Sequence, residues 1–115
     1  MLREAMLALR VTDMEYAPEI ARLLSAGQND LAIAGVAIEG GVHIEITEDP
    51  VTGTITAADD STIRDDLVKT ALITYVRVHF GSPADHDRLA ASYDLQRRQL
   101  ANATGYTEFG EGAEA

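Results

Sequence analysis

Apolar side chains recur at helical spacing through the first third of the chain. Residues 2–10 place Leu2, Met6 and Leu9 on one face, which predicts a short helix. Pro18 suits a first helical position, and Gly35 suits the end of a helix. Between them a second stripe recurs at three- and four-residue spacing, formed by Ile20, Leu23, Leu24, Gly27, Leu31 and Ala34. The pattern predicts two helices, with Gly27 at a close helix contact.

The period changes to two after residue 41. Val42, Ile44 and Ile46 alternate with polar residues, and the alternation resumes over 54–57. The intervening "EDPVTG" contains residue types that tight turns prefer. A pairing of Thr47 with Thr54 would place Ile46 opposite Ile55. We therefore predict a β-hairpin over about 42–58 with one apolar face.

Helical spacing returns for the rest of the patterned chain. Asp60, Ser61 or Thr62 can cap a helix that runs to Gly81, through the segment "TYVRVHFG". The β-propensity of that segment is the weaker signal, because its apolar stripe continues without a break. A further helix is predicted from Ser82-Pro83 to about residue 102.

These elements predict a mainly α fold, a small bundle of four helices with a β-hairpin inserted between the second and third main helices. Residues 1–106 would form a single domain, which suits a chain of 115 residues. Residues 107–115 carry three acids, two glycines and no core pattern. We expect them to form a flexible acidic tail.

Composition and charge limit the classes of function that the chain can have. The chain has no cysteine, nineteen acids and nine bases, for a formal charge of −10. This balance argues against a protein that neutralises a phosphate backbone. An acidic surface repels or mimics nucleic acid, or simply aids solubility. The N-terminal segment lacks the features of a signal peptide, and no apolar run is long enough for a membrane span. We expect a soluble protein.

Candidate catalytic and metal-binding residues do not form a recognised arrangement. His43, His79 and His86 lack the spacing of a metal site, and no serine lies in a G-x-S-x-G motif. The segment "GVAIEGG" matches neither a P-loop nor a dinucleotide-binding fingerprint. We expect no catalytic residues, no metal and no cofactor, and hence no enzyme.

Interaction surfaces are the remaining candidates. An isolated two-stranded hairpin is marginally stable in water, so its apolar face must cover the chain's own helices or another subunit. Both options are open from the sequence, and the strand edges are free to pair with a neighbour. Tyr106 and Phe109 stand near the acidic end, as helix-end contacts or as anchors for a partner. The interface candidates are Val42, Ile44, Ile46, Ile55, Tyr106 and Phe109.

Three stretches, covering about two thirds of the chain in order, resemble the head–tail connector (adaptor) proteins of long-tailed bacteriophages. The first resembles the family's two opening helices, the second its third helix with the aromatic-glycine stop, and the third its fourth helix. They read "LREAMLALRVTD" followed by "EIARLLSAGQNDLAIAGV", then "DDLVKTALITYVRVHFG", and finally "DRLAASYDLQRRQL" with "TGY". Residues 39–58 depart from the family, where this connection is commonly shorter or irregular.

The resemblance implies a virion structural protein at the head–tail interface, made in the bacterial cytoplasm. It implies a homo-oligomeric ring of about twelve copies with head-to-tail contacts. The ring would lie below the portal protein, extend the DNA channel and dock a downstream tail-side connector or stopper protein. DNA would pass without sequence-specific binding, and no membrane is involved. The alternative, which rests on charge alone, is an acidic regulatory or DNA-mimic binding module.

Overall fold

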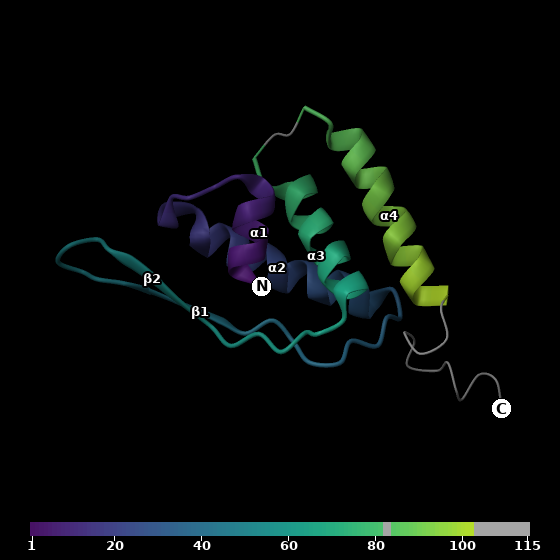
Figure 1. Ribbon diagram of the computed structural model, residues 1–115, viewed down its shortest axis with the longest axis horizontal. Helices are drawn as coiled ribbons and strands as arrows, with labels where there is room; N and C mark the ends of the chain where they lie inside the picture. Colours follow the sequence, from purple (N-terminus) through teal and green to yellow (C-terminus); the bar gives the residue numbers. More distant parts are fainter. Residues whose placement is uncertain (82–83, 103–115) are drawn as a thin grey trace.

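The computed structural model describes residues 1–81 and 84–102. It is mainly α-helical, with a two-stranded antiparallel hairpin between the second and third α-helices (Figure 1). The helices are α1 (Leu2–Leu9), the 3₁₀ turn η1 (Met14–Tyr16), α2 (Ala17–Ile33), α3 (Asp66–His79) and α4 (His86–Asn102). The strands are β1 (Ile44–Glu48) and β2 (Ile55–Asp59). None of the described helices is long and apolar enough to cross a membrane.

The helical interpretation of "TYVRVHFG" is confirmed, because α3 continues to His79. Gly81 follows with a φ of 64°, in the left-handed region that glycine favours. The start of α3 lies later than predicted. The Asp65 carboxylate, rather than a side chain at 60–62, accepts hydrogen bonds from the backbone N–H groups of Leu67 and Val68.

The ends of the other helices also differ in detail from the sequence expectation. α1 stops at Arg10, which adopts a left-handed φ of 58°. The unpredicted turn η1 then leads into α2, and the Asp13 side chain caps this turn by accepting from Glu15 N–H. α4 begins at His86, later than expected, and Ser82-Pro83 lies outside the described residues.

The core lies where α2 passes beneath α1 and α3. α3 contacts both α2 and α4, and α1 contacts α2 and α3. The largest fully buried side chains come from α2 and α3: Ile20, Leu24, Leu31, Val68, Leu72 and Val76. A Cβ atom added at Gly27 would lie 3.0 Å from a ring carbon of Tyr75. The close helix contact predicted at Gly27 is therefore present between α2 and α3.

The hairpin has its predicted apolar face but a different register. Ile46 pairs with Ala57 and Glu48 with Ile55, so the expected pairing of Ile46 with Ile55 is wrong by two residues. A shift of two keeps every side chain on its predicted face, because the side-chain period of a strand is two. Figure 1 shows the hairpin projecting well beyond the helices.

Candidate interaction surfaces

The base of the hairpin is fixed to the helices by hydrogen bonds between distant parts of the chain. The Val42 N–H donates to Oε1 of Gln28 in α2 at 2.6 Å. The segments on either side of the hairpin pair with each other, because the Gly41 N–H donates to Oγ1 of Thr62 and the Thr62 N–H donates to the Gly41 carbonyl, both at 2.9 Å. The hairpin therefore leaves the helices as a fixed arm rather than as a loose loop.

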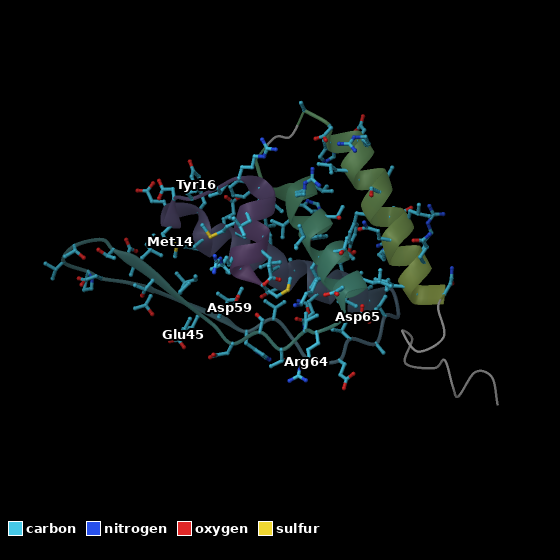
Figure 2. The ribbon with its side chains drawn as sticks, viewed as in Figure 1. Met14, Tyr16, Glu45, Asp59, Arg64 and Asp65 are labelled. Atoms are coloured by element: carbon cyan, nitrogen blue, oxygen red, sulfur yellow. The ribbon has the colours of Figure 1, made fainter. Side chains whose placement is uncertain are left out.

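Asp59 connects the end of β2 to the start of α1 (Figure 2). Its Oδ2 accepts hydrogen bonds from the Leu2 N–H at 2.7 Å and from the Met1 nitrogen at 2.8 Å. Burial favours a higher pKa for this carboxyl, but those bonds and the ones from Ser61 outweigh it and hold the pKa well below its usual range. A carboxylate beside a helix N-terminus also complements the helix dipole. Asp59 is thus a structural anchor for the arm.

The tip of the hairpin is held by its own polar groups. Oδ1 of Asp49 accepts from the N–H groups of Val51 and Thr52, at 2.8 and 3.2 Å. These backbone bonds lower the Asp49 pKa. Gly53 supplies the φ of 72° that closes the turn. The ordered turn presents the Val51 side chain to solvent, 90% exposed.

The predicted interface residues divide into three groups. Val42, Ile44 and Ile46 are half-buried and pack against the hydrophobic core. Ile55, nearer the tip, is half-buried but is not among the described residues that pack against the core. Tyr106 and Phe109, together with the tail at 107–115, lie outside the described residues. The chain's own core thus covers the base of the apolar face and leaves its distal end available.

Negative charge is concentrated in the segment that contains the hairpin. Residues 39–60 carry six of the nineteen acids and no lysine or arginine. Residues 107–115 carry three more acids, again without a base. Residues 1–38 and 61–102 together hold ten acids and all nine bases, so the helical part of the chain is nearly neutral. The excess of −10 therefore belongs mainly to the arm and the tail.

A basic and apolar stripe lies on the outer face of α1. Arg3, Leu7 and Arg10 recur at i, i+4 and i+7, all three are exposed, and Leu7 is 66% exposed. Beside it is a groove of about 430 Å³ between α1, the segment that follows it and β2. Its lining is largely apolar: Leu2, Arg3, Met6, Leu7, Val11, Thr12, Met14, Ala57 and Asp59. The sequence argument considered only the opposite, buried face of α1, although the spacing of these three residues signals the stripe.

A polar cluster joins α2 to α4, and the sequence reasoning missed it. The Tyr93 hydroxyl donates to Oδ2 of Asp30, and Nη1 of Arg97 lies 3.4 Å from the same oxygen. Arg97 also donates to Asp94 at 2.9 Å. Burial and the hydrogen bond to Asp30 raise the pKa of Tyr93 far above its usual value, so the phenol stays protonated. The cluster therefore holds α2 and α4 together through a hydrogen bond and an ion pair.

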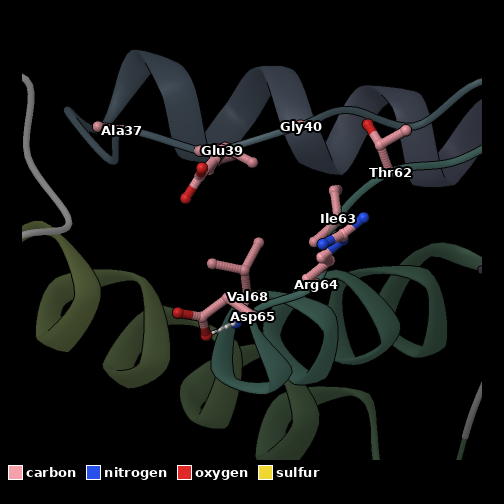
Figure 3. A pocket seen from close by; sticks show the side chains of 9 residues that line it. Ala37, Glu39, Gly40, Thr62, Ile63, Arg64, Asp65 and Val68 are labelled. Carbon is pink, nitrogen blue, oxygen red and sulfur yellow. Dashed lines mark hydrogen bonds between the residues drawn. The ribbon is translucent and has the colours of Figure 1, made fainter.

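A cavity of about 480 Å³ lies between residues 37–40 and the start of α3 (Figure 3). Arg64 and Glu39 supply charged groups at its lining. The side chain of Asp65, which also lines it, is engaged in capping α3. The lining contains no serine, histidine or cysteine, and the hydroxyl of Thr62, which also lines it, accepts a hydrogen bond from the Gly41 N–H.

The three histidines do not come together. His43, His79 and His86 are exposed and belong to three different parts of the fold, and the ring of His79 stacks against Tyr75 at 4.3 Å. Across residues 1–81 and 84–102, no group of three histidine, cysteine or carboxylate side chains could hold a metal ion. Surfaces, rather than a reactive centre, are the features that the described residues offer.

Comparisons of the chain with protein-family models, with curated proteins and with solved structures gave no significant match.

Proposed function

We propose that this chain is a head–tail connector of a long-tailed bacteriophage. In this proposal it is a virion structural protein that forms a ring below the portal, extends the DNA channel and docks a tail-side protein. It is made in the bacterial cytoplasm and acts at the head–tail interface. It has no catalytic residues and needs no cofactor.

The connector assignment rests on the resemblance of the helical segments, and the structural observation that supports assembly is the projecting hairpin, fixed at its base and uncovered at its tip. Two strands alone are marginally stable in water, and the distal half of this hairpin extends past the helices that support its base (Figure 1). At the end of this ordered arm Val51 is exposed and Ile55 is not covered by the core, and together they leave apolar surface that assembly would cover. An arm that meets a different surface of the next copy makes a heterologous contact, the type that closes into rings.

The helices provide further support. α3 and α4 lie in two of the three segments that resemble the family, and they pack on each other with the rings of Tyr75 and Tyr93 5.3 Å apart. We infer that α1, α2, α3 and α4 form a small four-helix bundle, which would act as the rigid body of the ring subunit. The Asp30–Tyr93 hydrogen bond would fix α4 within that bundle.

The charge distribution fits a DNA channel. Attraction between a channel wall and DNA grows with the number of phosphates that the wall neutralises, so a moving duplex needs a wall with few exposed bases. An acidic segment at residues 39–60 facing the lumen would repel the duplex. In this proposal DNA is therefore conducted without sequence-specific binding.

The test is assembly of the chain alone and with phage portal rings. Size-exclusion chromatography with light scattering would measure the mass of the chain alone, over a range of concentration and salt, and mixed with portal rings. We expect monomers that form rings at high concentration or on the portal, visible by negative-stain electron microscopy. If neither rings nor portal binding forms at any salt concentration, the connector proposal fails.

The same samples test the acidic DNA-mimic alternative. A mimic would bind a basic DNA-binding protein tightly, and added duplex DNA would compete for that protein. Portal binding that is insensitive to added DNA favours the connector. Tight capture of a basic DNA-binding protein, released by DNA and with no affinity for portal, would favour the mimic instead.

The tail offers a separate test of the portal contact. Deletion of residues 107–115 removes three acids and Phe109, all of which lie outside the described residues. We expect an unchanged circular dichroism spectrum and weaker portal binding. Unchanged portal affinity would remove the tail from the proposed interface and leave the ring proposal standing.

A further inference from the structure

We propose that the hairpin tip of one copy docks on the α1 stripe and the neighbouring groove of a second copy. The inference rests on the ring assembly proposed above and specifies which two surfaces meet. The tip surface consists of Glu48, Val51 and Ile55. The acceptor surface consists of the stripe formed by Arg3, Leu7 and Arg10, with the groove beside it.

The tip surface combines apolar and acidic groups. Ile55 pairs directly across the hairpin with Glu48, so the two side chains share a face. Val51 extends from the turn beyond them and is the most exposed of the large apolar side chains described. Glu45, which pairs with Ala58 toward the base, lies on the opposite face of the hairpin and is not part of this surface. The tip thus offers an aliphatic end with the Glu48 carboxylate beside it.

The acceptor surface has the complementary composition. Leu7 and the groove provide uncovered apolar area, Arg3 lines the groove, and Arg10 is exposed immediately after the end of α1. Among the described residues neither arginine has an ion-pair partner, whereas the acidic neighbour Glu4 lies near the Met1 nitrogen and Lys69. An arginine pair beside an apolar groove suits an aliphatic segment that carries a carboxylate.

The two surfaces belong to different copies because the arm cannot fold back. Asp59 and Gln28 fix its base beside α1 and α2, and the tip lies at the end of the arm farthest from the helices (Figure 1). A tip that docks on a groove elsewhere on an identical chain makes a heterologous contact. Repetition of that contact generates a ring or an open helix, and the portal supplies the symmetry that closes it.

Charge exchange across the contact gives the first experiment. Arg3→Glu with Arg10→Glu should raise the concentration for half-maximal assembly about tenfold or more, and Glu48→Lys should also raise it. Combining all three changes should restore assembly to within a few-fold of the original chain, because opposite charges face each other again. Arg22→Glu, at an exposed position on α2, is the matched control.

Cysteine cross-linking gives a second, independent experiment, since the chain has no native cysteine. A disulfide requires Cα atoms within about 7 Å, so it reports proximity directly. The double variant Leu7→Cys with Val51→Cys should form a ladder of covalent oligomers on oxidation. Each single variant should give dimers at most. Val51→Cys paired with Ile33→Cys, at an apolar position 86% exposed on α2, should give no ladder.

The outcomes separate this inference from the connector proposal. If the original chain assembles on portal but the charge variants behave as wild type and no ladder forms, the docking inference is wrong and the connector proposal stands. If Val51→Asp preserves the ring and abolishes binding to a tail-side protein, the tip serves another partner and the inference is likewise overturned. If the chain never assembles, the connector proposal itself is wrong.

Discussion

Removal of one hydroxyl tests whether the Asp30–Tyr93 contact holds α4 in place. Tyr93 is 8% exposed and donates to a carboxylate that is 32% exposed. A hydrogen bond to a charged group contributes about 1.5–3 kcal/mol. Water can reach part of Asp30, and Arg97 stays beside it in the variant. Tyr93→Phe should therefore lower the free energy of unfolding by about 1–2 kcal/mol.

Urea denaturation followed by far-ultraviolet circular dichroism measures this difference, with an unchanged slope against denaturant. The melting temperature should fall by about 4–8 °C for each kcal/mol of stability lost. Tyr75→Phe is the matched control, because the ring of Tyr75 packs beside Tyr93 but its hydroxyl has no hydrogen-bond partner among the described residues. We expect that control to change stability by about 0.5 kcal/mol or less. Equal stabilities for the two variants would refute the assigned role of the Tyr93 hydroxyl.

Three further substitutions test the anchor, the hairpin base and the core. The pKa of Asp59 is lower in the folded chain than its ordinary value of 3.8, so the carboxylate stabilises the fold fully above that pH. This stabilisation is lost as the pH falls below 3.8, and Asp59→Asn should flatten that part of a plot of stability against pH. Gly40→Ala, at a φ of 87° with the Thr62 carbonyl oxygen 2.5 Å from the added Cβ, should destabilise the chain by at least about 1 kcal/mol in urea titrations, whereas Gly35→Ala meets no atom and should cost less. Leu24→Ala, at a fully buried site, should cost about 2–5 kcal/mol in the same assay, and a loss below 1 kcal/mol would contradict its core position.

Periodicity predicted the element types because burial of one face imposes the spacing of apolar residues. Val68, Leu72 and Val76 recur at four-residue intervals, and all three are buried in α3. The same signal cannot determine the hairpin register, since a slip of two residues preserves both faces. The register depends instead on the turn, where the Asp49 carboxylate accepts hydrogen bonds from two backbone N–H groups and the strands close with Glu48 opposite Ile55 rather than with Thr47 opposite Thr54.

The interaction surfaces were harder to predict than the elements. The alternation in residues 42–46 identifies an apolar face but not what covers it, and the structure places Val42, Ile44 and Ile46 against the chain's own core. The Asp30–Tyr93 contact joins residues that are 63 positions apart, so no local sequence pattern predicts it. Such contacts follow from the way the helices pack, which the spacing of apolar residues along one helix does not specify.

The anchored base of the hairpin makes the reach of the arm adjustable. Because Asp59 and Gln28 hold the base independently of the tip, residues inserted near the turn leave the helices undisturbed. Two residues added to each strand would lengthen the arm by about 7 Å and preserve the orientation of every side chain, whereas one residue would invert the distal face. The length of the arm can therefore change only in steps of two residues per strand if its faces are to be kept. Each such step would alter the spacing between neighbouring molecules.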